Sequence, residues 1–115
     1  MSTMRNKYGA IKTYSELCGR TFDSKAEARH GEELRLLELA GKIKNLEYQI
    51  PFKLCDKPRI KITIDFKYRK WDGYIEFDGG GYDVYEDVKG ILTRDSRTKL
   101  AWLKEKYYID VKLIR

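Results

Sequence analysis

Hydrophobic and polar residues alternate strictly along two stretches in the middle of the chain. In "LEYQIPFKL", Leu46 to Leu54, every second residue is apolar, and "RIKITIDFKYR", Arg59 to Arg69, repeats the pattern. Because successive side chains of a strand point to opposite faces of the sheet, this period of two predicts two β-strands. Pro51 lacks a backbone N–H donor, so the first strand is expected at a sheet edge or at a bulge.

A helical pattern with marked ends precedes these strands. Within "SKAEARHGEELRLLELAG", Ser24 followed by Glu27 fits a capping box, and Gly41 stands where a left-handed C-terminal residue belongs. The side expected to face the core consists of Ala26, His30, Leu34, Leu37 and Ala40. A second helix is expected from about Ser96 to Tyr107.

The remaining segments complete an α/β pattern. Residues 1–23 indicate an arm or a short hairpin, "DGGG" at 78–81 supplies turn residues, and "YIEF" before it is expected to prolong the preceding strand. "YDVYEDVK" and the final "IDVKLI" are the third and fourth predicted strands. The predicted order is therefore αβββαβ, a mixed central sheet flanked by helices.

Length and composition favour one intracellular domain. A chain of 115 residues is long enough to bury a core without disulfides, so we expect a single domain, 1–115. It has no apolar run long enough for a membrane span and no secretory pattern at its start, which predicts a soluble cytoplasmic protein. Two cysteines and one histidine give no zinc or disulfide framework.

Charge is distributed unevenly along this basic chain. The formal net charge is +6, with seven Lys/Arg against two acids in residues 51–71 and seven against three in residues 91–115. Residues 72–90 instead carry six acids and one lysine, Lys89. This pattern indicates a polyanionic partner around a cation-binding centre, although ordinary variation in surface charge gives the same pattern.

The stretch "YEDVKG" places Asp87 and Lys89 on one face of its strand and Glu86 on the other. Asp65 lies on the polar face of the preceding strand, so the carboxylates of Asp65 and Asp87 converge if the two strands are neighbours. Two carboxylates, with water and a phosphate oxygen, suit Mg²⁺, and an adjacent ammonium can assist phosphoryl chemistry. The alternative is a surface pair of a carboxylate and a lysine.

A third acidic ligand is available from the first helix. Glu27 is at its N-terminal end, where its side chain can reach over a sheet edge, although it can equally close the capping box with Ser24. Glu33 is the alternative ligand, because it is an acid within the arc bounded by Leu37 and Ala40.

The order "FDSKAEARHGEELRLLELAGKIKNLEYQIPFKL", "ITIDFKY" and "YEDVKG" resembles small phage-encoded proteins of the PD-(D/E)XK nuclease superfamily, and its layout is similar to Holliday-junction-resolving endonucleases. The resemblance implies a restriction-endonuclease-like fold. It also implies catalytic roles for Glu27, Asp65, Asp87 and Lys89, with the three acids holding Mg²⁺ or Mn²⁺. Ile64 stands where the superfamily name has proline.

The resulting hypothesis is a Mg²⁺-dependent endonuclease that hydrolyses DNA phosphodiesters. The resemblance adds branched DNA as the substrate, a homodimer as the active form and a bacterial host as the setting. Seven basic residues are expected to contact DNA phosphates: Lys61, Lys67, Arg69, Lys70, Arg94, Arg97 and Lys99. The alternatives are a non-catalytic nucleic-acid-binding module and a small phage protein that binds a host factor.

Overall fold

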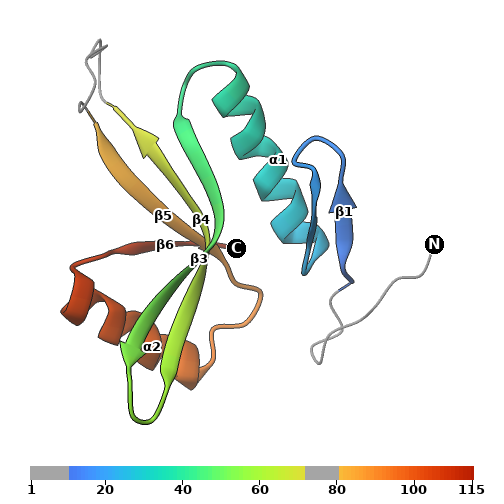
Figure 1. The fold of residues 1–115 in the computed structure, drawn as a ribbon. Coiled ribbons are helices and arrows are strands. Elements are labelled where there is room, and N and C mark those ends of the chain that lie inside the picture. Colours follow the sequence, from blue (N-terminus) through green and yellow to red (C-terminus); the bar gives the residue numbers. More distant parts are fainter. Residues whose placement is uncertain (1–10, 72–80) are drawn as a thin grey trace. The chain divides into compact units, whose positions relative to one another are not determined.

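The computed structural model describes residues 11–71 and 81–115, which form eight elements in two compact units. Unit 1 is Met1–Lys44 and unit 2 is Asn45–Arg115. The order β1-β2-α1-β3-β4-β5-α2-β6 (Figure 1) confirms the predicted αβββαβ series after an N-terminal hairpin. That the whole chain is one domain stays a prediction.

Unit 1 consists of a two-stranded hairpin and one helix. Strands β1 (Thr13–Ser15) and β2 (Arg20–Phe22) pair antiparallel, and α1 (Lys25–Leu39) contacts both. The predicted buried face of α1 was right at Leu34, which is 3% exposed, and wrong at Ala26, Leu37 and Ala40, which are exposed. The other buried residues of the helix are Glu27, Ala28 and Gly31.

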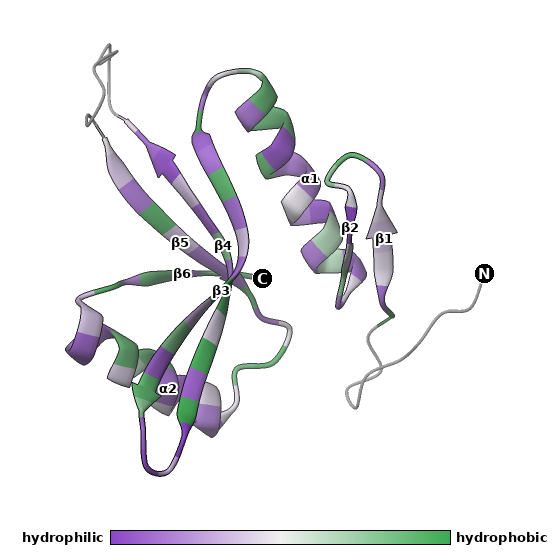
Figure 2. Ribbon diagram, viewed as in Figure 1, coloured by the Kyte–Doolittle hydropathy of each residue, from purple (hydrophilic) through white to green (hydrophobic). Residues whose placement is uncertain are grey.

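Unit 2 contains a four-stranded mixed sheet in the order β3-β4-β5-β6. Its strands are β3 (Lys44–Cys55), β4 (Ile60–Lys70), β5 (Tyr82–Val88) and β6 (Val111–Ile114). Strand β5 lies antiparallel to β4 and parallel to β6, so the sheet is mixed as predicted. Figure 2 shows the alternating hydropathy along β3 and β4, and β3 with Pro51 is at the edge of the sheet, as expected.

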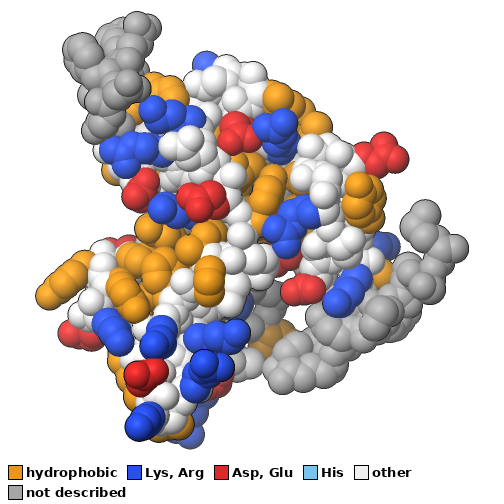
Figure 3. All heavy atoms as spheres, in the orientation of Figure 1, with side chains coloured by type: hydrophobic (Ala, Val, Ile, Leu, Met, Phe, Trp, Pro, Cys, Tyr) orange, Lys and Arg blue, Asp and Glu red, His pale blue; other side chains and the backbone are white. Residues whose placement is uncertain are grey.

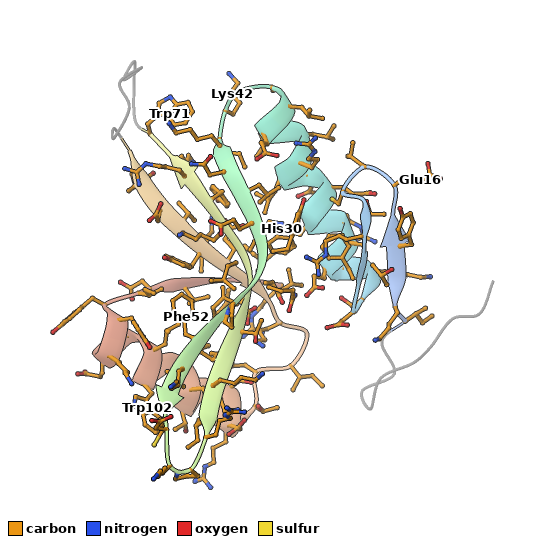
Figure 4. All side chains as sticks on the ribbon, in the orientation of Figure 1. Glu16, His30, Lys42, Phe52, Trp71 and Trp102 are labelled. Atoms are coloured by element: carbon orange, nitrogen blue, oxygen red, sulfur yellow. The ribbon has the colours of Figure 1, made fainter. Side chains whose placement is uncertain are left out.

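The helix α2 (Arg94–Tyr107) precedes β6 and anchors the core of this unit. Leu54, Ile64 and Leu103 form a buried cluster, each at most 2% exposed. Phe52 of β3 and Trp102 of α2, both labelled in Figure 4, pack against it. Burial of these apolar side chains is the main term that holds α2 against the strands.

The predicted strand extension "YIEF", Tyr74 to Phe77, and residues 78–80 of the predicted turn lie outside the described residues. The strands on either side of them pair antiparallel, up to Lys70 opposite Tyr82. Among the helices that the structure describes, none has both the length and the apolar character needed to cross a membrane.

Gly81 introduces β5 in a conformation that other residues resist. Its φ is +91°, and a Cβ atom there would lie 2.4 Å from the backbone oxygen of Lys70. We expect Gly81→Ala to lower the free energy of unfolding by about 2 kcal/mol or more, because neither the φ angle nor the backbone oxygen can adjust cheaply. Urea denaturation measures the effect.

Gly90→Ala is the matched control for this substitution. Gly90 does not have a positive φ, and nothing lies within 4 Å of an added Cβ. Its change should stay within about 0.5 kcal/mol. Equal stability of the two variants would contradict the account of Gly81.

Candidate active site

The carboxylates of Asp65 and Asp87 meet where the backbone ladder between β4 and β5 ends. The last pair in this ladder is Phe66 with Glu86. Beyond it, Asp87 Oδ1 accepts a hydrogen bond from the backbone N–H of Asp65 at 3.0 Å, and Asp65 Oδ2 accepts one from that of Val88 at 2.9 Å. Each carboxylate thus replaces a backbone acceptor of its own strand and ties the two strands together.

Asp87 is almost fully enclosed, with 1% of its surface exposed. Its Oδ2 atom lies 2.9 Å from Lys89 Nζ, its ion-pair partner, and the Lys89 side chain remains 29% exposed. Any other cation that binds this oxygen must therefore displace Lys89.

The surroundings of Asp87 favour its neutral form. Burial is the largest cause, and the negative charge and hydrogen bonding of Asp65 add to it, so that the pKa of Asp87 is raised from 3.8 to about 6. Lys89 opposes this shift by stabilising the carboxylate. Paired acids with a raised pKa are typical of sites that bind a cation or transfer a proton, although structural pairs show the same effect.

Gln49 is a residue of this site that the sequence did not single out. It lies within β3 at a φ of 54°, in the left-handed region that non-glycine residues seldom adopt. Its Nε2 donates to Asp65 Oδ1 at 3.2 Å. The sequence carried one usable signal, because Gln49 and Asp65 both lie on the polar faces predicted for their strands.

Glu86 takes no part in this cluster, as strand parity predicted. It is 3% exposed, and its Oε2 accepts a hydrogen bond from the hydroxyl of Tyr68 at 2.6 Å. Burial, followed by this hydrogen bond and the negative charge of Glu86, raises the pKa of Tyr68 well above its usual value. The two adjacent acids of "YEDVKG" therefore serve different faces of the sheet.

Glu27 and Glu33 belong to unit 1 and differ in their surroundings. Glu27 is 5% exposed, and its carboxylate accepts a hydrogen bond from the backbone N–H of Asp23 at 3.1 Å. The backbone N–H of Glu27 donates to Ser24 Oγ at 3.0 Å. The Ser24 half of the predicted capping box is therefore present, whereas the Glu27 carboxylate bonds the residue before the cap. Glu33 is 66% exposed beside His30. The role of either acid as a third ligand stays a prediction.

The seven basic residues expected to contact phosphates fall into three groups. Lys67 and Arg69 form ion pairs with Glu47 and Asp83, at 3.7 Å and 3.1 Å. Lys61 and Lys99 line one pocket together with Lys89. The other three are exposed: Lys70, Arg94 and Arg97. Figure 3 shows Lys and Arg side chains gathered around the turn between β3 and β4, residues 56–59, and over α2.

The donor atoms at Asp65 and Asp87 fit a hard divalent cation. Within residues 11–71 and 81–115, no group of three or more His, Cys, Asp and Glu side chains is arranged to hold a metal ion. Mg²⁺ does not need such a cage, because it is commonly bound by one or two carboxylates, water and substrate phosphates. The oxygens that a metal ion could take are Asp87 Oδ2, once Lys89 is displaced, and those of Asp65, which accept hydrogen bonds from Gln49 and Val88.

A family model described as "Protein of unknown function (DUF1064)" matches residues 5–115, nearly the whole chain. No curated protein and no solved structure matches the chain.

The raised pKa of Asp87 predicts how stability depends on pH in metal-free protein. The folded state holds the Asp87 proton up to about pH 6, whereas the unfolded chain releases it near 3.8. As the pH rises through this window, the wild type should therefore lose stability relative to Asp87→Asn, which has no proton to release. At roughly 1.4 kcal/mol per pKa unit, the change is about 3 kcal/mol at most.

Urea denaturation in EDTA at pH 4 and pH 7 measures this difference. Asp83→Asn supplies the comparison for loss of an exposed carboxylate on the same strand. The account of the buried acid pair would be contradicted if the Asp87→Asn variant kept the same difference from wild type at both pH values.

Proposed function

We propose that this chain, which belongs to the DUF1064 family, is a metal-dependent endonuclease that hydrolyses DNA phosphodiester bonds. One observation carries the proposal. Asp65 and Asp87 converge at the end of a strand ladder, with an enclosed oxygen of Asp87 directed at a cation, Lys89, 2.9 Å away. The order of Asp65 on β4, Asp87 on β5 and Lys89 just after β5 also supports assignment to the PD-(D/E)XK superfamily.

In this proposal Asp65 and Asp87 hold Mg²⁺, or Mn²⁺ in its place. A metal ion bound there would polarise the phosphate as a Lewis acid and would lower the pKa of a water molecule. Lys89 stands beside Asp87 with part of its side chain exposed, so its ammonium group can stabilise negative charge that develops on the phosphate or position the attacking water. Gln49 holds the Asp65 carboxylate in place.

The substrate is proposed to be DNA because the site is acidic and its surroundings are basic. The lysines and arginines around the turn between β3 and β4 and on α2 supply positive charge that can contact DNA phosphates. Binding should therefore weaken steeply with salt and depend little on sequence.

Branched DNA is the proposed form of the substrate, and a homodimer is the proposed active form. The support is the resemblance to junction-resolving nucleases, together with symmetry. A four-way junction needs two equivalent cuts, and a two-fold dimer presents two identical sites.

Substitutions at the acid pair test the catalytic role. We expect Asp87→Asn and Lys89→Met to lower Mg²⁺-dependent nicking by on the order of 100-fold or more, because the first removes a proposed metal ligand and the second a cation beside the reacting phosphate. Binding of the same DNA should survive, with the salt dependence of Lys89→Met reduced by about one phosphate contact. Nicking of supercoiled plasmid and gel-shift titrations at several salt concentrations measure the two effects.

Asp83→Asn and Lys112→Met are the matched controls, since both change exposed charges of unit 2 outside the site. Nicking by Asp87→Asn and Lys89→Met at the rate of these controls would rule out the proposed catalytic roles. Unaltered DNA binding with no nicking by wild type in Mg²⁺ or Mn²⁺ would favour a non-catalytic nucleic-acid-binding module. Absence of DNA binding at every salt concentration would favour a protein that binds a host factor.

A panel of substrates tests the proposed preference for branches. Linear, supercoiled, single-stranded and four-way-junction DNA are incubated with the protein, with and without Mg²⁺ or Mn²⁺. We expect paired cuts at the junction to exceed cuts in linear duplex of the same sequence by at least tenfold. Equal rates on junction and linear duplex would rule out specificity for branches while leaving the nuclease activity intact.

A further inference from the structure

A pocket of about 190 Å³ opens beside the acid pair within unit 2. It is bounded by the first residues of β4, by Lys89 just after β5, and by the first turns of α2. Its volume is below the roughly 300–1,000 Å³ of sites for drug-sized molecules, so it suits a small group rather than a whole nucleotide. Its polar lining consists of Lys61, Thr63, Lys89, Asp95, Ser96 and Lys99.

The lining carries an excess of positive charge, with three lysines against one aspartate. Asp95 is 77% exposed and pairs with Lys99 at 3.3 Å, and Asp87 pairs with Lys89. Among the residues that the structure describes, none forms an ion pair with Lys61. Thr63 and Ser96 add hydroxyl donors. Ammonium and hydroxyl groups around a small pocket are suited to phosphate oxygens.

The N-terminus of α2 does not supply this site by itself. The backbone N–H of Ser96 already donates to Thr93 Oγ1 at 3.1 Å, and Thr93 Oγ1 is also 3.0 Å from Ser96 Oγ. Recognition of an anion in this pocket therefore depends on side chains contributed by β4, by α2 and by Lys89.

The pocket and the acid pair lie in sequence along one face of β4. Lys61, Thr63 and Asp65 alternate with inward-facing residues, so they share the face on which Asp87 meets Asp65. Two residues of a strand advance about 7 Å, a step comparable with that between neighbouring phosphates of a DNA strand. Lys89 connects the two places, because it pairs with Asp87 and also lines the pocket.

We propose that this pocket binds a backbone phosphodiester next to the scissile one and thereby determines which bond reaches the acid pair. The inference rests on the proposed nuclease function, which it deepens by naming a phosphate subsite of that same site. Lys61 and Lys99 neutralise the flanking phosphate, and Thr63 and Ser96 donate to its oxygens. Lys89 acts at the boundary between the two phosphates.

Binding of inorganic phosphate tests the pocket without relying on catalysis. Metal-free full-length protein is titrated with phosphate at constant ionic strength, and backbone amide shifts are followed by NMR. We expect saturable shifts at Thr63, Ser96 and Lys99, and at least a tenfold weaker apparent affinity in the double variant Lys61→Met/Lys99→Met. The charge-matched control is Lys104→Met/Lys112→Met, whose lysines are exposed and lie outside the pocket. Equal phosphate affinity in the two double variants would overturn the proposal.

Cleavage of chemically modified DNA tests the assignment to a flanking phosphodiester. A single neutral methylphosphonate on one side of the mapped cut should slow wild-type cleavage by roughly tenfold. The same substitution should slow cleavage by the Lys61→Met/Lys99→Met variant little further, since this variant already lacks the lysines that contact that phosphate. An equal effect in both proteins would refute the assignment. The assignment would also be refuted if cleavage depended on a terminal phosphate of the DNA and not on the internal phosphodiester next to the cut.

The two experiments separate failure of the subsite from failure of the function. Phosphate binding that needs Lys61 and Lys99, in a protein that nicks no DNA, would support the pocket as an anion site and refute the nuclease. If nicking requires Asp87 but phosphate binding is unchanged when Lys61 and Lys99 are replaced, the subsite alone is refuted.

Discussion

The reciprocal contact between Asp65 and Asp87 is the interaction on which the site depends. Each carboxylate accepts a backbone N–H from the opposite strand just beyond the last ladder pair, so the two acids are fixed by the main chain rather than by flexible side-chain contacts. Burying Asp87, and holding it beside a second acid, has an energetic cost that is visible in its raised pKa. A divalent cation would offset that cost more fully than Lys89 alone, which is a physical reason to assign a metal to the site.

The arrangement around this contact separates two tasks. Asp87 pairs with Lys89 on one side of the sheet, whereas Glu86 on the other side accepts a hydrogen bond from the hydroxyl of Tyr68. Along the same strand, charge changes from acidic at Asp65 to basic at Lys61 over four residues. A polyanion that follows β4 would meet its attractive contacts next to the proposed metal site. Positive charge that would steer DNA and negative charge that would hold the proposed metal ion can therefore coexist within one small unit.

Strand parity made most of this site predictable. The alternation around Asp65 and within "YEDVKG" gave both strands, and it placed Asp65 with Asp87 and Glu86 apart from them. Gln49 escaped prediction because its left-handed φ occurs without glycine or a turn motif. The face of α1 was predicted only in part, because hydropathy identifies Leu34 but cannot reveal that Glu27 is buried with its carboxylate bound to a backbone N–H. The pocket required the return of α2 to β4, a tertiary contact that no local pattern encodes.

The central claim is that Asp65 and Asp87 together hold a divalent metal ion. The most direct measurement is a crystal structure of the full chain soaked in Mn²⁺, with anomalous diffraction used to locate the ion. The account predicts an anomalous peak within metal–ligand distance of both carboxylates, with Lys89 Nζ moved away from Asp87. Full occupancy of Mn²⁺ elsewhere on the protein, with the ion pair between Asp87 and Lys89 unchanged, would contradict it.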